Sequence, residues 1–344
     1  RARRSALPVF LRGLLLRVFD NDGQLLCQPE VLVISCLRQI FDSFKTIKAL
    51  PTKRKVLDAY QKFVDIDSEV GDHQTPAEAL WRFSRTADRL WPRVLSDVEM
   101  VAFSNSFRPR HGPGSTSDRV FGNAKWSISD WPAYLDSEFP CEEYAVANSS
   151  LITESGINLS EPGEHLTSRV TAVPKTAKGP RLIAMEPYLH QFLQQGILRE
   201  LVNALETSPL TKQSVRFTDQ SVNRALALES SKSLSFSTLD LSEASDRVPL
   251  RLVELMLRST PHLLRKMLAC RSTDSVLPDG TNVHLKKWAS MGSALCFPVL
   301  AMYVFTCIVS YRYRATGSLG RALREARSVA VYGDDIIVPT EWFR

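Results

Sequence analysis

The chain has 344 residues, of which 44% are hydrophobic and 23% are charged. This composition excludes disordered and fibrous proteins and suffices for a large core in two or three subdomains. Lys and Arg outnumber Asp and Glu by 43 to 37, so the surface permits nucleic-acid binding without requiring it. The six cysteines form no CxxC pair, which argues against a disulfide scaffold or a zinc site.

The first third of the chain is predicted to be mainly helical. Apolar residues recur at helical spacing over residues 29–50, and a second helical stretch runs from Thr75 or Pro76 to residue 97. No apolar run reaches the length of a membrane span. Residues 7–20 are therefore interpreted as buried structure, with a helix lying on a membrane surface as the alternative.

A loop rich in Gly, Pro and basic residues follows at residues 108–126. Its segment His111–Asp118 lacks the Gly-Lys-Ser/Thr ending of a P-loop, so a surface turn and a contact with a nucleic-acid template both remain open. Further on, two strands joined by a basic loop are predicted between residues 168 and 187, followed by a helix and by a short strand that ends on Asp240.

The last hundred residues combine a long apolar helix with a hairpin. The helix follows a Ser/Gly-rich opening at residues 289–295. An arginine-rich stretch at residues 312–327 has two interpretations: the solvated face of a helix, or a surface that follows an RNA backbone. The hairpin spans Val329–Pro339, where Gly333 and Asp334 supply the turn between two strand-forming runs.

Carboxylates stand at two predicted strand ends. Asp334 and Asp335 lie in the hairpin turn, which alone would be read as a common surface turn, but Asp240 ends another strand in the same way. Neighbouring strands would bring the three carboxylates together, where they repel unless cations lie among them. Such a cluster suits the two-metal chemistry of phosphoryl transfer.

Three segments around these aspartates resemble a known family. "DLSEASD" (Asp240–Asp246), "SMGSALCF" (Ser290–Phe297) and "VYGDD" (Val331–Asp335) resemble motifs A, B and C of viral RNA-dependent RNA polymerases. Their spelling is similar to that of the replicases of single-stranded RNA phages, the leviviruses, and of narnavirus and ourmiavirus-like relatives. Upstream, "VPKTAKGPRLIAMEP" resembles motif F of that family.

The resemblance implies a role for each acidic residue of these motifs. Asp240 and Asp334 would be the principal ligands of two Mg²⁺ ions, with Mn²⁺ as a substitute, and Asp335 would be a third metal-site carboxylate. Asp246 would read the ribose 2′-hydroxyl of the incoming nucleotide, which distinguishes RNA from DNA precursors.

The resemblance also implies nucleotide contacts outside the acidic motifs. Lys175, Lys178 and Arg181 would hold the triphosphate, although a solvated basic loop is the usual fate of such a run. Ser290 and Gly292 would form a flexible loop against template and nucleotide. In the same motif Cys296 occupies a Thr-like place, and the Asn that many viral polymerases carry does not follow.

We therefore expect an α+β protein with the right-hand polymerase fold, in which an antiparallel palm sheet is backed by helices. Residues 1–150 are expected to be a helical N-terminal region of the fingers, residues 151–235 fingers with motif F, and residues 236–344 palm. Motifs D and E and the thumb would follow the hairpin, so we expect the thumb to be missing from this chain and the chain alone to be poorly active.

The expected activity is RNA-directed RNA polymerisation that replicates a positive-strand RNA virus genome. Template RNA, product RNA and ribonucleoside triphosphates would be its partners, with host translation factors added in a phage-type enzyme, and the host cytoplasm, bacterial by the phage resemblance, would be its location. A reverse transcriptase and a non-catalytic RNA-binding protein with a polymerase-like fold are the alternatives.

Overall fold

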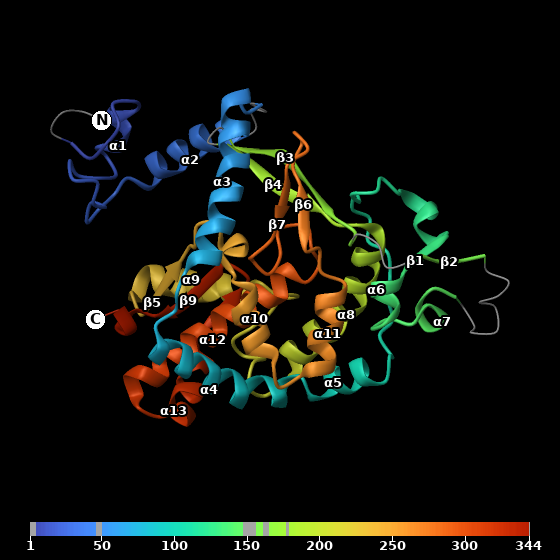
Figure 1. Ribbon diagram of the computed structural model, residues 1–344. Coiled ribbons are helices and arrows are strands. Elements are labelled where there is room, and N and C mark those ends of the chain that lie inside the picture. Colours follow the sequence, from blue (N-terminus) through green and yellow to red (C-terminus); the bar gives the residue numbers. More distant parts are fainter. Residues whose placement is uncertain (1–4, 46–49, 147–155, 161–164, 177–178, 344) are drawn as a thin grey trace. The chain divides into compact units, whose positions relative to one another are not determined.

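The computed structural model describes residues 5–45, 50–146, 156–160, 165–176 and 179–343 of the chain (Figure 1). The chain divides into two compact units. The first contains Arg1–Leu57 and Pro174–Arg181, and the second contains Asp58–Val173 and Leu182–Arg344. Helices and strands are mixed along the chain, so the fold class is α+β, as expected.

The first unit has a small apolar core near the amino terminus. Helices α1 (Arg12–Leu15) and α2 (Val31–Lys45) contribute side chains to this core. The core consists of Leu7, Leu15, Val18, Val33 and Leu37. Helix α2 confirms the helix predicted over residues 29–50, of which residues 46–49 lie outside the described part. Residues 7–20, predicted to be buried structure, are buried only in part: Leu7, Leu15 and Val18 are buried, whereas Val9, Phe10 and Leu16 are exposed.

Helices make up most of the second unit. The longer ones are α3 (Lys53–Asp72, in this unit from Asp58), α4 (Ala77–Val94), α5 (Ser96–Phe103), α8 (Tyr188–Thr207), α9 (Ser221–Ser233), α10 (Leu250–Leu257), α11 (Pro261–Ala269) and α12 (Cys296–Thr316). The shorter ones are α6 (Ala133–Asp136), α7 (Cys141–Tyr144), α13 (Leu319–Glu325), η1 (Gly122–Trp126), η3 (Ala244–Arg247), η4 (Ala326–Ser328) and η5 (Thr340–Phe343).

The helix predicted from Thr75 or Pro76 is confirmed at its start and divided near its end. Helix α4 begins directly after Pro76 and contains Pro92 in its last turns. At Leu95 the backbone leaves helical geometry, with φ −104° and ψ 11°, and α5 then continues to Phe103. The chain therefore changes direction where the sequence pattern indicates one continuous helix.

Helix α12 is central to the main core of the second unit. Helices α4, α10 and α13 pack against it (Figure 1), and Trp91 donates a buried hydrogen bond to Thr306 Oγ1 at 3.0 Å. Among the described residues, α12 alone is long and apolar enough to cross a membrane, which corrects the expectation that no apolar run has that length. However, 61% of its most apolar window is buried inside the protein, as in a core helix.

The described strands form three sheets. Strands β1 (Asp130–Pro132) and β2 (Asn158–Ser160) pair in parallel. A four-stranded sheet has the order β4-β3-β6-β7, with β3 (Ser168–Thr176), β4 (Gly179–Met185), β6 (Asp274–Val276) and β7 (Asn282–His284). Strands β3 and β4 are the two strands predicted around the basic loop. The third sheet has the order β5-β9-β8, with β5 (Phe236–Leu239), β8 (Ala330–Tyr332) and β9 (Asp335–Pro339).

The β5-β9-β8 sheet is antiparallel and positions the acidic motifs. Leu239 pairs with Ile336 across β5 and β9, and Tyr332 pairs with Asp335 across β8 and β9. Val331, Ile336 and Val338 belong to the main core, while α9 contacts all three strands. The sheet is therefore anchored by its apolar side chains, and its acidic residues stand at one end.

Candidate functional site

The tight turn of the acidic hairpin depends on a glycine. Gly333 and Asp334 connect the Tyr332–Asp335 pair, and Gly333 has φ +63°. A positive φ at the first of two turn residues is the requirement of a type II′ hairpin turn, which favours glycine there. A Cβ at Gly333 would also collide with the ring of Phe297 in the first turn of α12. The hairpin is thus held close against that ring.

The three predicted metal-site carboxylates lie at the same end of this sheet. Continuing the Leu239–Ile336 pairing by one residue sets Asp240 opposite Asp335, and directly opposed residues project to the same face. Burial raises the pKa of Asp335, and the charges of Asp334 and Asp240 raise it further. Asp240, Asp334 and Asp335 are all exposed, so a ligand can reach them.

These carboxylates do not yet make a closed metal-binding group. Within the described residues, no set of three or more His, Cys, Asp or Glu side chains is arranged to hold a metal ion. The oxygen donors nevertheless have the chemistry that hard divalent cations prefer, and their mutual repulsion is what a cation would relieve. The donor set fits Mg²⁺ in type, while the ligand geometry is incomplete.

A cavity of about 220 Å³ lies beside Asp335, between α9 and the sheet. Its wall consists of Gln220, Asn223, Arg224, Ala227, Thr238, Leu239, Tyr332, Asp335, Ile336 and Ile337. It is smaller than the usual range for small-molecule sites, about 300–1,000 Å³. It therefore widens the space next to the carboxylates without being large enough for a whole nucleotide.

Asp246 is placed differently from the other acidic residues. It lies in η3, its side chain is 17% exposed, and its Oδ1 atom is 3.0 Å from Nζ of Lys287. The side chain of Lys287 has no exposed surface. The sequence predicted Asp246 as a ribose contact but gave no role to Lys287.

The Ser-Met-Gly segment is bound tightly to β4. The amide of Ala184 donates to the carbonyl of Met291 at 2.8 Å. Gly292 has φ +131°, and a Cβ there would collide with the carbonyl of Ala184. The close backbone approach expected of this glycine is thus made to the protein's own strand. Ser290 is buried, and its Oγ has no hydrogen-bond partner among the described residues.

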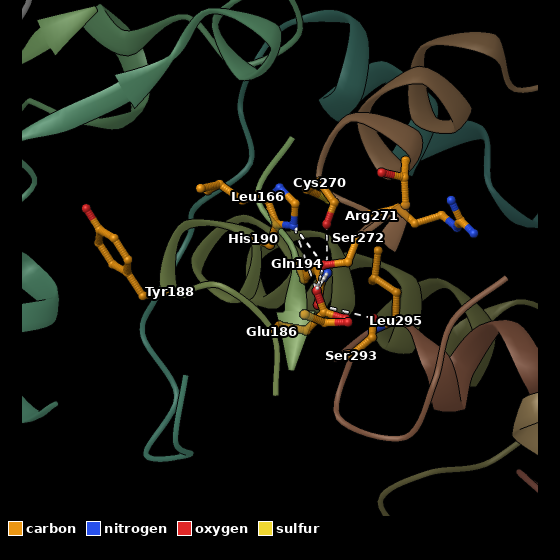
Figure 2. A network of polar contacts seen from close by, with 12 residues as sticks. Leu166, Glu186, Tyr188, His190, Gln194, Cys270, Arg271, Ser272, Ser293 and Leu295 are labelled. Carbon is orange, nitrogen blue, oxygen red and sulfur yellow. Dashed lines mark hydrogen bonds and ion pairs between the residues drawn. The ribbon is translucent and has the colours of Figure 1, made fainter. Parts of the chain in front are cut away.

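A buried glutamine on α8 holds the end of this segment (Figure 2). Oε1 of Gln194 accepts hydrogen bonds from Ser293 Oγ at 3.2 Å and from the amide of Ala294 at 3.0 Å. Its Nε2 donates to the carbonyl of Cys270 at 2.7 Å. Because Gln194 is 1% exposed, water cannot replace these contacts, and the amide fixes the loop that precedes α12.

Glu186 and its neighbours extend this buried network (Figure 2). Ser272 Oγ donates to Glu186 Oε2 at 2.6 Å, and Nδ1 of His190 lies 3.8 Å from the same oxygen. Nearby, the guanidinium of Arg271 donates to the carbonyls of Leu285, Lys287 and Trp288 at 2.6–2.8 Å. Sequence reasoning missed this network, although Glu186 and Gln194 among apolar neighbours could have marked it.

The structure does not test the predicted triphosphate contacts. Lys175 and Arg181 are exposed on β3 and β4, but they belong to the first unit, whereas the carboxylates belong to the second. Lys178 lies outside the described residues. The role of all three side chains stays a prediction.

The loop at His111–Asp118 is tied into the protein by its own contacts. Lys125 Nζ donates to the carbonyls of Gly112 and Gly114 at 2.8 and 2.6 Å. The ring of His111 stacks on Phe192 at 4.5 Å, and burial lowers its pKa to about 4, helped by the charge of Lys125. Asp118 accepts from the amide of Tyr188. These contacts favour a structural turn over a phosphate site.

The arginine-rich stretch near the hairpin is partly neutralised. Arg312 and Arg321 both donate to the carboxylate of Glu325, and the guanidinium of Arg312 lies 4.5 Å from the centre of the Trp342 ring. Two of the five arginines are therefore used in local contacts, and the choice between a solvated helix face and a surface along an RNA backbone stays open for the stretch.

The chain belongs to the family of the RNA replicase beta-chain, whose model matches residues 53–344. This match covers the strand-end carboxylates, the Ser-Met-Gly segment and the helices that hold them. It confirms the resemblance to RNA-phage replicases that the three motifs indicated.

Within this family, the chain is similar to curated polymerase subunits of RNA viruses. It is 34% identical over 251 residues to the RNA-directed RNA polymerase subunit beta of Qbeta virus (strain MX1), covering 72% of this chain and 39% of that protein. It is 34% identical over 174 residues to the corresponding subunit of Enterobacteria phage SP, covering 51% and 28%. The chain thus spans at most about two fifths of the length of these relatives.

A comparison with solved structures gives a more distant likeness. The RNA-dependent RNA polymerase from bacteriophage phi12 is 14% identical, with a TM-score of 0.46, covering 87% of this chain and 53% of that chain.

Proposed function

We propose that this chain carries the nucleotidyl-transfer centre of an RNA-directed RNA polymerase that copies a positive-strand RNA virus genome. The observation that carries the proposal is the register of the β5-β9-β8 sheet, which sets Asp240 opposite Asp335 and next to the Asp334 turn. Membership of the RNA replicase beta-chain family supports it. So do the names of the curated relatives, which are RNA-directed RNA polymerase subunits.

Asp240 and Asp334 would be the principal Mg²⁺ ligands, with Asp335 as a third carboxylate. Bound Mg²⁺ would activate the attacking 3′-hydroxyl and offset charge on the α-phosphate and the leaving pyrophosphate. Mg²⁺ is commonly held by one or two carboxylates together with substrate phosphates. The incomplete ligand group at this sheet is consistent with that mode, in which the nucleotide supplies the remaining oxygens.

The remaining roles follow the same assignment. Lys175, Lys178 and Arg181 would contact the triphosphate, and Asp246 the ribose. The loop at Ser290 and Gly292 would lie against template and nucleotide. In this proposal, the β5-β9-β8 sheet with α10 and α12 is the palm of a right-hand polymerase, and the basic hairpin belongs to the fingers.

The direct test is primer extension on an RNA template with Mg²⁺. The assay compares the 344-residue chain with the longest reading frame that contains it, using ribonucleotides or deoxyribonucleotides. We expect template-directed ribonucleotide incorporation that Asp334→Ala and Asp240→Asn each reduce about 10²–10³-fold, the order seen when one preorganised transition-state contact is removed. Asp97→Ala, which removes an exposed carboxylate on α5, serves as the matched control and should retain activity.

Two outcomes would contradict the proposal. Extension that survives Asp334→Ala would mean that the hairpin is only a turn. Preferential incorporation of deoxyribonucleotides would identify a reverse transcriptase and remove the assigned role of Asp246.

A further inference from the structure

A fully buried lysine, Lys287, contacts Asp246, the residue predicted to bind the ribose. The side chain of Lys287 is 0% exposed, and its Nζ lies 3.0 Å from Oδ1 of Asp246. The same Nζ lies 3.4 Å from the centre of the Phe63 ring on α3, within cation–π range. A buried ammonium needs a partner of opposite charge, and Asp246 supplies it.

The backbone around Lys287 is fixed from several sides. Its amide donates to Oδ1 of Asp67 at 3.1 Å, and its carbonyl accepts from Arg271 at 2.7 Å. On either side, Trp288 N donates to the carbonyl of Val248 and Leu250 N to the carbonyl of Lys286. These bonds join the segment to the chain just after Asp246, so the two charged side chains are held in register.

The pair leaves part of Asp246 available to a ligand. Its Oδ1 faces Lys287 and is buried, yet the two atoms are not aligned for a hydrogen bond. The side chain as a whole is 17% exposed, so the exposure belongs to its other atoms. Lys287 can therefore fix the orientation of the carboxylate through their close contact while one edge of the carboxylate remains open.

We propose that Lys287 is a positioning residue that holds the Asp246 carboxylate for recognition of the ribose 2′-hydroxyl and thereby sets the preference for ribonucleotides. The inference rests on the polymerase function proposed above. Lys287 cannot touch a nucleotide itself, because its ammonium group is enclosed by protein. It acts through Asp246, which would accept a hydrogen bond from the 2′-hydroxyl.

The Asp246–Lys287 pair also lies near Cys296 of the Ser-Met-Gly motif. No Asn follows Cys296 to bind the ribose or to hold the acidic residue. Burial raises the pKa of the Cys296 thiol, the charge of Asp246 raises it further, and the charge of Lys287 lowers it. Lys287 contacts Asp246 from the segment that directly precedes the Ser-Met-Gly motif.

The test measures ribose selectivity, not activity alone. Incorporation of ATP and of 2′-dATP opposite a templating U is measured as kcat/KM for the wild type, Lys287→Met, Asp246→Asn and the double variant. Lys287→Met keeps the length of the side chain and removes its charge. Lys286→Met is the matched control, because its side chain is 48% exposed and lies 3.9 Å from Asp72.

We expect Lys287→Met to lower the ATP to 2′-dATP ratio on the order of tenfold, mainly through loss of ATP incorporation. Asp246→Asn should lower the ratio similarly, and Lys286→Met should not change it. The double variant should be no less selective than Asp246→Asn, because a residue that acts through Asp246 has no further effect once the carboxylate is gone.

A charge-retaining variant protects the test against misfolding. Removing either partner of a buried ion pair is strongly destabilising, so Lys287→Met and Asp246→Asn are both checked by thermal melts. If Lys287→Met does not fold, Lys287→Arg decides the inference: it keeps the charge but displaces the donor that lies 3.0 Å from Asp246. We expect it to lower the ATP to 2′-dATP ratio, and an unchanged ratio would overturn the inference.

Three outcomes would overturn the inference while leaving the polymerase in place: a wild type without ribose preference, an unchanged ratio in folded Lys287→Met, or losses that add in the double variant. All variants are made in the longest reading frame that contains the chain, and a wild type of that length that incorporates neither nucleotide would instead refute the polymerase function, and the inference with it.

Discussion

Replacing Gly292 by Ala should damage the Ser-Met-Gly segment more than a positive φ alone explains. At φ +131°, a residue with a Cβ is strained by about 1–3 kcal/mol. The new Cβ would also meet the carbonyl of Ala184. That strand residue is held by its own hydrogen bond to Met291, so relief of the collision would break a bond worth about 1 kcal/mol.

Together these effects give a loss of roughly 2–4 kcal/mol in the free energy of unfolding, or about 3–6 °C in Tm for a chain of this length. The matched control is Gly280→Ala, because Gly280 has φ +89° but nothing within 4 Å of an added Cβ. It should cost only the backbone strain, about 1–2 kcal/mol. Urea unfolding and thermal melts of both variants measure the difference. Equal losses in the two variants would refute the argument that Ala184 blocks the position.

Three further substitutions test the contacts that hold the site. Gln194→Leu should lower the free energy of unfolding by about 2–4 kcal/mol, because it leaves buried hydrogen-bonding groups of the loop unsatisfied. Gln195→Leu is the control, and an equal loss of stability in both variants would contradict this role of Gln194. Asp67→Ala should cost a similar amount, measured by urea unfolding, because its buried carboxylate accepts the amides of Lys286 and Lys287; an effect no larger than that of Asp65→Ala would be evidence against it. Hydrogen bonding to Arg258 lowers the pKa of Asp88, so its ionised form stabilises the fold above the unfolded-state pKa, and this stability is lost as pH falls through the folded-state pKa. Asp88→Asn should therefore cost about 0.5–1 kcal/mol at pH 7, as expected of an exposed pair. The difference from wild type should disappear as pH falls below the folded-state pKa of Asp88; a pH-independent difference would exclude the ion pair as its cause.

Local sequence patterns predicted the parts of the site that local forces determine. The hairpin at Val329–Pro339 follows from strand-forming residues on both sides of a glycine that accepts positive φ. The strand before Asp240 and the helix after Cys296 follow in the same way from neighbouring residues. In each case the interactions that determine the structure lie within a few positions along the chain.

Partners distant in sequence could not be predicted in this way. Lys286 and Lys287 are adjacent and identical in type, yet one side chain is 48% exposed and the other is 0% exposed. Nothing in the sequence separates them, because their environments are made by α3 and η3. Gln194 likewise gains its role from a loop about 100 positions later. The structure supplies these residues, whereas the motif resemblance supplied the aspartates.

The hydrogen bond from the amide of Lys287 to the carboxylate of Asp67 has a consequence for folding during synthesis. The two residues are 220 positions apart, and the buried bond between Trp91 and Thr306 spans 215 positions. At about 5–20 residues per second, on the order of 10–40 s of translation separates the two halves of each contact. Contacts of such range are also slow to form, because a long loop must close first.

During synthesis, the apolar faces of α3 and α4 therefore stay exposed until the later segments that carry the three motifs leave the ribosome and can pack against them. A fragment that begins after α4 and keeps every motif lacks Asp67, which accepts the amide of Lys287, and Trp91, which donates to Thr306. We therefore expect the smallest folding fragment of this chain to be much longer than the stretch that its motifs define.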